Sequence, residues 1–104
     1  MDMNIEELAV FIIANAGDSK SNSLAAIEAA KEGDFEKAHK YLELSEKALI
    51  EAHKSHTHLI VKDSKEGFPL TFLLVHASNH LSNAELAKEF AGWYIYMKGG
   101  ERHV

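Results

Sequence analysis

The chain has 104 residues, a net charge of −5, 46% hydrophobic residues and no cysteine, which fits one domain over residues 1–104 and excludes a disordered chain. The acidic balance argues against nucleic-acid binding and against docking on anionic lipid, and the lack of cysteine excludes disulfides, thiolate metal sites and thiol catalysis. No apolar run is long enough to cross a membrane, and the acidic start lacks the basic region of a signal peptide, so we expect a cytoplasmic protein.

The first predicted helix runs from about Asn4 to Lys31. Asn4 suits its N-cap, because two glutamates follow in the first turn and complement the helix dipole. Within this helix the polar stretch NAGDSKSNS (residues 15–23) interrupts the apolar spacing, and we expect a bend or a close backbone approach at Gly17. The stretch is not a phosphate-binding loop, since it lacks the glycine spacing and the Lys-Ser/Thr end of that motif.

The second predicted helix runs from about Phe35 to Val61. Gly33 suits the end of the first helix and Asp34 suits the N-cap of the second. The residues VKDSKEGFP (61–69) that follow predict a loop.

The third predicted helix starts near Pro69, a residue that suits a first helical turn, and ends near Lys98. Two glycines stop it, and residues 99–104 are expected to form a flexible tail. We therefore expect an all-α fold of three long antiparallel helices, up-down-up, joined by short loops.

A heptad stripe follows the third predicted helix. Apolar residues recur about every seventh position along it, which is typical of helices that pack against copies of themselves. One asparagine, Asn79, sits in the middle, where a polar residue costs stability but fixes register and copy number. We interpret the stripe as an oligomer interface made of Phe72, Val75, Asn79, Asn83, Leu86, Phe90, Trp93 and Met97.

Two histidines four residues apart, His76 and His80, should stack on one face of the third helix. As a metal pair they lack the third and fourth ligands that zinc requires, and only Glu36 and His39 have the Glu-x-x-His spacing of a di-iron bundle. Two interpretations of the pair remain: both are ordinary surface histidines, or one of them carries a phosphoryl group. Periodicity does not decide between these interpretations.

A second histidine cluster, His53, His56 and His58, falls near the expected end of the second helix. Histidines there complement the helix dipole and the last carbonyls, which is the interpretation we favour. Such a cluster can also bind a transition metal adventitiously.

Nearly the whole chain resembles the IIA component of the lactose/cellobiose/chitobiose type of the bacterial phosphoenolpyruvate-dependent sugar phosphotransferase system. The matching stretches are IIANAGDSKSNSLAAIEAAKEGDFEKAHKYLELSEKALIEAHKSHTHLI and LLVHASNHL. The resemblance implies three helices per protomer and a parallel homotrimer of nine helices, with the third helices around the axis. This agrees with the interface interpretation of the heptad stripe.

The resemblance also implies a function. The chain would accept a phosphoryl group from the phosphocarrier protein HPr on His76, with His80 supporting the phosphate. It would then pass the group to a cysteine of a cognate IIB protein, which phosphorylates a β-linked disaccharide entering through the membrane component IIC. Contact with the membrane would therefore be indirect. Lys20 and Lys54 could offset the added negative charge, but the sequence does not place either beside His76.

Two positions depart from the family motif, which reads His-Ala-Gln-Asp-His-Leu. Ser78 replaces Gln, which removes a longer hydrogen-bonding arm near the phosphorylation site. Asn79 replaces the Asp that, in the family, binds magnesium at the trimer axis, and a neutral amide lacks the charge that holds such an ion. The departures leave open a trimeric interaction or regulatory module without phosphotransfer. A two-component phosphotransfer bundle and a metal-storage protein are further alternatives.

Overall fold

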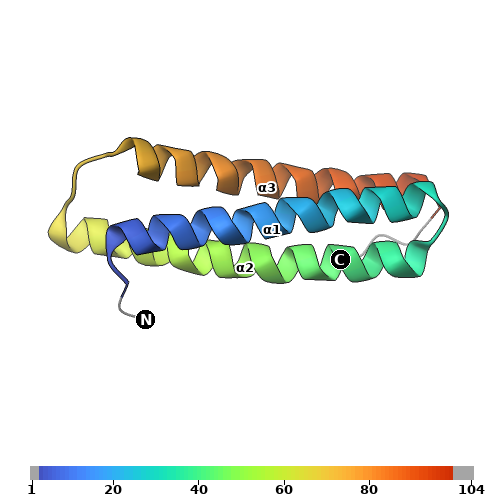
Figure 1. The fold of residues 1–104 in the computed structure, drawn as a ribbon, viewed down its shortest axis with the longest axis horizontal. Helices are drawn as coiled ribbons and strands as arrows, with labels where there is room; N and C mark the ends of the chain where they lie inside the picture. The colour runs from blue at the N-terminus through green and yellow to red at the C-terminus, as the bar shows by residue number, and fades with distance from the viewer. Residues whose placement is uncertain (1–2, 100–104) are drawn as a thin grey trace.

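Three long helices make up the computed structural model, which describes residues 3–99. They are α1 (Ile5–Lys31), α2 (Phe35–Glu66) and α3 (Phe72–Met97), and no strand occurs among the described residues. The bundle measures 49 × 23 × 16 Å. The helices α1 and α3 run in the same direction, and α2 runs in the opposite direction (Figure 1). The prediction of an all-α, up-down-up fold is confirmed for one protomer. Of the predicted tail at 99–104, only Gly99 lies within the described residues.

Side chains at its N-terminus explain why α1 begins where it does. Asn4 accepts a hydrogen bond from the Glu7 amide at 2.8 Å, and the Glu7 carboxylate accepts one from the Asn4 amide at 3.0 Å. This reciprocal capping box satisfies two backbone donors that the first turn would leave unpaired. The predicted N-cap is thus confirmed.

Gly33 closes α1 with a positive φ of 81°. The amide of Gly33 donates to the carbonyl of Ala30, and the amide of Asp34 donates to that of Ala29, both at 3.0 Å. These are the two bonds of a Schellman motif. Asp34 then caps α2 by accepting a bond from the Lys37 amide at 3.1 Å, so the chain reverses direction in three residues.

The connection between α2 and α3 was predicted too long, because α2 continues beyond Val61 to Glu66. The polar residues after Val61 include good helix formers, and the first residue that breaks the helix is Gly67, whose φ is 66°. The predicted helix start at Pro69 is also wrong. Thr71 is the N-cap of α3, with its hydroxyl accepting from the Leu74 amide at 3.2 Å.

Two apolar clusters form the core, and α1 contributes to both. The cluster nearer the N-terminal end of α1 centres on Leu8 and Ile12 against Leu74 and Leu81 of α3. The cluster at the other end contains Ile95 of α3, Leu42 of α2 and several alanines. Alanines at the contact positions let the three helix backbones approach closely, which fixes the register of α3 against α1.

A buried serine network lies between the two apolar clusters. The hydroxyls of Ser19 and Ser23 on α1 hydrogen-bond to the hydroxyl of Ser45 on α2, at 2.9 and 2.7 Å, and all three side chains are fully buried. The polar stretch of residues 15–23 therefore neither breaks α1 nor exposes all its serines. The expected close approach at Gly17 is wrong within the protomer, since a Cβ there would meet no atom within 4 Å.

Replacing Ser45 with alanine should destabilise the bundle by about 1–3 kcal/mol, because it leaves two buried hydroxyls without their shared partner. Urea unfolding at fixed protein concentration measures this change. Ser82→Ala, on the exposed surface of α3, is the matched control and should stay within about 0.5 kcal/mol of the wild type. Equal effects of the two substitutions would contradict a stabilising role for the network.

Candidate functional site

His76 and His80 form a hydrogen-bonded pair on α3, as their spacing predicts. Their Nε2 atoms are 3.2 Å apart and the rings meet edge to face, with centroids separated by 4.5 Å at 85°. His76 is exposed and His80 is half-buried. For two neutral rings, such a bond requires one Nε2 to carry the proton and the other to present its lone pair. The pair therefore presents a nucleophilic nitrogen beside a donor.

One helical turn before the pair, Phe72 extends the column of rings. Its ring lies nearly parallel to that of His76, at 11°, with centroids 6.1 Å apart. Phe72 is itself 86% exposed, so it forms an open apolar border to the histidine pair. The ring of His76 thus lies between the rings of Phe72 and His80.

The heptad stripe faces away from the core of the bundle. Leu74, Ala77 and Leu81 are buried against the other helices, whereas all eight residues of the stripe are exposed. Phe90 and Met97 remain 62% and 75% accessible. A row of large exposed apolar side chains of this kind marks an interaction site on a protein of this size. The histidine pair borders this surface through Phe72.

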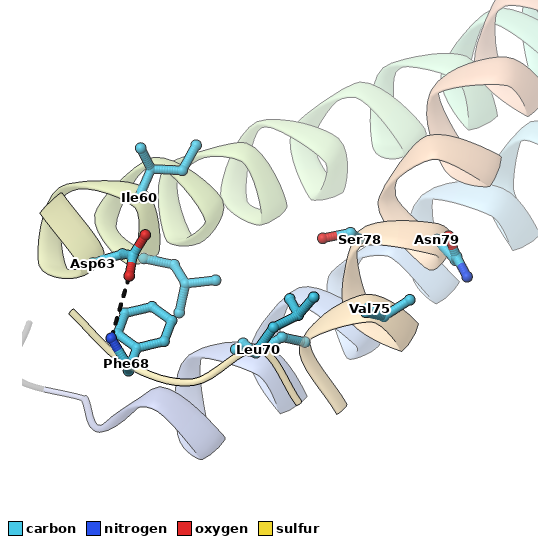
Figure 2. A pocket seen from close by; sticks show the side chains of 9 residues that line it. Ile60, Asp63, Phe68, Leu70, Val75, Ser78 and Asn79 are labelled. Atoms are coloured by element: carbon cyan, nitrogen blue, oxygen red, sulfur yellow. Dashed lines mark hydrogen bonds between the residues drawn. The ribbon is translucent and has the colours of Figure 1, made fainter. Parts of the chain in front are cut away.

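A cavity of about 250 Å³ opens on the other flank of α3, between α3, the end of α2 and the loop joining them. Figure 2 shows Ser78 directed toward α2 and Asn79 directed away from it. Asp63 accepts a hydrogen bond from the Phe68 amide at 3.3 Å and holds the loop over this cavity. The lining residues are Leu59, Ile60, Asp63, Phe68, Leu70, Leu74, Val75, Ser78 and Asn79.

The cavity corrects the placement of Ser78. Two residues along a helix turn the side chain to roughly the opposite side, so Ser78 does not lie beside His76 within one protomer. The serine lines the cavity on the flank of α3 that faces α2, while the histidines occupy the other flank of the heptad stripe. The expected loss of a hydrogen-bonding arm near His76 therefore does not apply to the single chain.

The residues at the expected metal position do not fit magnesium. Mg²⁺ is held by carboxylates and strongly bound waters, and Asn79 offers a neutral amide. The neighbouring exposed residues along the heptad stripe are apolar, apart from Asn83. Over residues 3–99 no three or more His, Cys, Asp or Glu side chains come close enough together to hold a metal ion. No step of the function below involves a metal.

The second histidine cluster is not at a helix end. Because α2 continues to Glu66, His58 lies two turns before its C-terminus, and the interpretation based on the helix dipole is wrong. His53 instead lies 3.5 Å from the carboxylate of Glu85 on α3. A second pair, Lys88 and Glu46 at 3.8 Å, also joins these helices. Polar side chains thus bridge the outer edges of α2 and α3, and such exposed pairs contribute little to stability.

Within residues 3–99, none of the helices is long and apolar enough to cross a membrane.

A small helical bundle with an exposed histidine pair has close structural relatives. The crystal structure of the cellobiose-specific phosphotransferase-system enzyme IIA from Bacillus anthracis matches with a TM-score of 0.87 and 30% identity, covering 94% of this chain and 91% of that one. The solution structure of the IIA(chitobiose)–HPr complex from Escherichia coli matches with a TM-score of 0.81 and 37% identity, covering 93% and 95%.

Sequence comparisons agree with the structural ones. The N,N′-diacetylchitobiose-specific EIIA component of Escherichia coli K12 is 41% identical over 86 residues, which cover 82% of this chain and 74% of that protein. Residues 7–98 match the model of the lactose/cellobiose-specific IIA subunit of the phosphotransferase system. The chain belongs to this family and is a phosphotransferase-system component.

Proposed function

We propose that this protein is a cytoplasmic phosphoryl carrier that accepts a phosphoryl group from phospho-HPr on His76. The observation that carries the proposal is the exposed, hydrogen-bonded pair of His76 and His80 in a chain of the IIA family. HPr as the donor is supported by the structural relative, which was solved as a complex with HPr.

The geometry of the pair suits the transfer. When His80 donates from Nε2, His76 holds its own proton on Nδ1 and presents a lone pair on Nε2. The hydrogen bond from His80 must first break, because it occupies this lone pair. The lone pair then attacks phosphorus, the new N–P bond forms, and the P–N bond of the donor phosphohistidine breaks with its electron pair staying on the donor ring. The N–H of His80 is then positioned to donate to a phosphoryl oxygen. Through this hydrogen bond, His80 orients the phosphoryl group and stabilises the negative charge on its oxygen.

The next acceptor in this proposal is the cysteine of a cognate IIB protein. This chain has no cysteine of its own, so the thiolate must come from a partner. The sugar would be a β-linked disaccharide, as for the relative named for N,N′-diacetylchitobiose. A phosphoramidate remains reactive enough to transfer its phosphoryl group onward to a thiolate.

We further propose that the protein assembles as a parallel homotrimer through the heptad stripe. The exposed apolar residues of the stripe lie opposite the core, so three copies can bury them around one axis without rearranging the bundle. The histidine flank of each copy would border this interface and remain open to partner proteins.

The intact mass of the protein after incubation with phosphoenolpyruvate, enzyme I and HPr tests the carrier function. We expect the wild type to gain one acid-labile phosphoryl group and His76→Ala to gain none. His58→Ala changes an exposed histidine on α2 and should still be phosphorylated, which makes it the matched control. Phosphorylation of His76→Ala would refute the assignment of the acceptor.

No phosphorylation of the wild type, with the trimer intact by light scattering, would support the alternative function. The protein would then be a trimeric interaction module in which the changes at Ser78 and Asn79 accompany the loss of transfer.

A further inference from the structure

A groove of about 320 Å³ lies on the flank of α3 that faces α1, C-terminal to the histidine pair, and neither histidine lines it. This flank of α3 carries residues spaced three or four apart, which places them in one row along the helix. They are His76, His80, Asn83, Ala87 and Phe90. The last three of these residues line the groove, together with Leu86. Its α1 side consists of Lys20, Leu24 and Ile27.

Lys20 is the one charged residue among those lining the groove. Lys20 faces the level of Asn83, which lies about 4.5 Å along the helix axis from the level of His80 and about 10.5 Å from that of His76, given the rise per residue. Side chains of a helix lean toward its N-terminus, and α1 runs parallel to α3 (Figure 1). The flexible four-carbon stem of Lys20 therefore extends toward the histidine pair.

Lys20 is also available to a new anion. None of the ion pairs within residues 3–99 involves it, whereas Lys54, Lys62 and Lys88 each lie within 3.8 Å of a glutamate. Asp18, the nearest acidic residue in the sequence, is two positions away and turns to another side of α1. Lys54 lines a different hollow, between α1 and α2, with His58 and Glu51. The structure thus separates two lysines that the sequence left equivalent.

We propose that Lys20 binds the phosphoryl group carried by His76 and supplies the positive charge that the dianion needs. The proposal rests on His76 as the phosphorylated residue. His80 is the hydrogen-bond donor on one side of the phosphoryl group, and Lys20 is the cation on its α1 side. Such a cation stabilises the charged phosphoryl oxygens.

The test uses ³¹P NMR of the full-length protein phosphorylated with the small-molecule donor phosphoramidate, so that loading does not depend on HPr. In the wild type the phosphoryl resonance should titrate to the dianion at a pH lower by roughly 0.5–1 unit than in Lys20→Gln, because a nearby cation favours the dianion. Lys20→Arg should keep most of the shift. Lys47→Gln removes an exposed lysine of α2 and is the matched control for net charge.

Identical titrations of the wild type and Lys20→Gln would overturn the proposal, as would an equal change in Lys47→Gln. Phosphorylation by phospho-HPr is measured separately on the same variants, and Lys20→Gln should slow it roughly threefold to tenfold. If the wild type accepts nothing from phospho-HPr but shows the titration shift, the carrier function fails while the phosphate-binding role of Lys20 stands.

Discussion

Replacing Leu86 with glutamate is expected to convert the proposed homotrimer into monomers. Leu86 lies near the middle of the heptad stripe and is 57% exposed in the protomer, so the folded bundle tolerates a carboxylate there. In the trimer three carboxylates would be buried around the axis, and the desolvation of each costs several kcal/mol. Association should weaken by at least roughly 100-fold. Analytical ultracentrifugation over a range of protein concentrations measures the change.

Leu44→Glu provides the matched control for this substitution. Leu44 is a leucine of α2 with a similar exposure of 48%, and it lies outside the heptad stripe. It should leave the trimer intact, and both variants should keep the helical circular dichroism of the wild type. A trimeric Leu86→Glu, or an equal loss of assembly in Leu44→Glu, would show that the stripe is not the interface.

Replacing Asn79 with aspartate is expected to make assembly depend on a divalent cation. Three aspartates near one axis repel each other when ionised, and a magnesium ion relieves that repulsion by binding them. The variant should therefore associate about 10- to 100-fold more weakly in a chelator than in millimolar magnesium. The wild type, with neutral amides at this position, should associate equally under both conditions. Light scattering over a dilution series follows the two proteins.

A control substitution away from the axis tests whether the magnesium dependence of assembly comes from the position of the new carboxylate and not only from the added negative charge. Thr57→Asp places one new carboxylate on the exposed surface of α2 and should not respond to magnesium. Dissociation of the wild type by chelator would mean that the amides do bind a cation. An Asn79→Asp variant indifferent to magnesium would mean that this residue does not meet its copies at the axis.

Helix ends could be predicted where a single residue type dictates the backbone. Asn4 and Asp34 were identified as N-caps because their side chains accept from amides in the following turn, and Gly33 because it adopts a positive φ. The end of α2 was missed because a polar run is compatible with both a loop and an exposed helix. Only the position of Gly67 and the contacts of the loop decide between them.

The serine network shows what periodicity cannot detect. Ser19 and Ser23 belong to the stretch 15–23, which was predicted to interrupt the apolar spacing of the first helix, because an isolated serine suits either surface or core. Their burial depends on a partner hydroxyl from another helix, 22 or 26 residues away in the sequence. No pattern within one helix contains that information.

By itself, the sequence determined the class of fold, the stacking of His76 and His80, and the apolar stripe, because each depends on spacing within one helix. Only the tertiary structure decided what lies beside these features. It placed Ser78 on the flank away from the histidines and Lys20 on theirs. The physical reason is that such neighbours depend on which sides of two helices face each other, and that is set by the packing of the whole core.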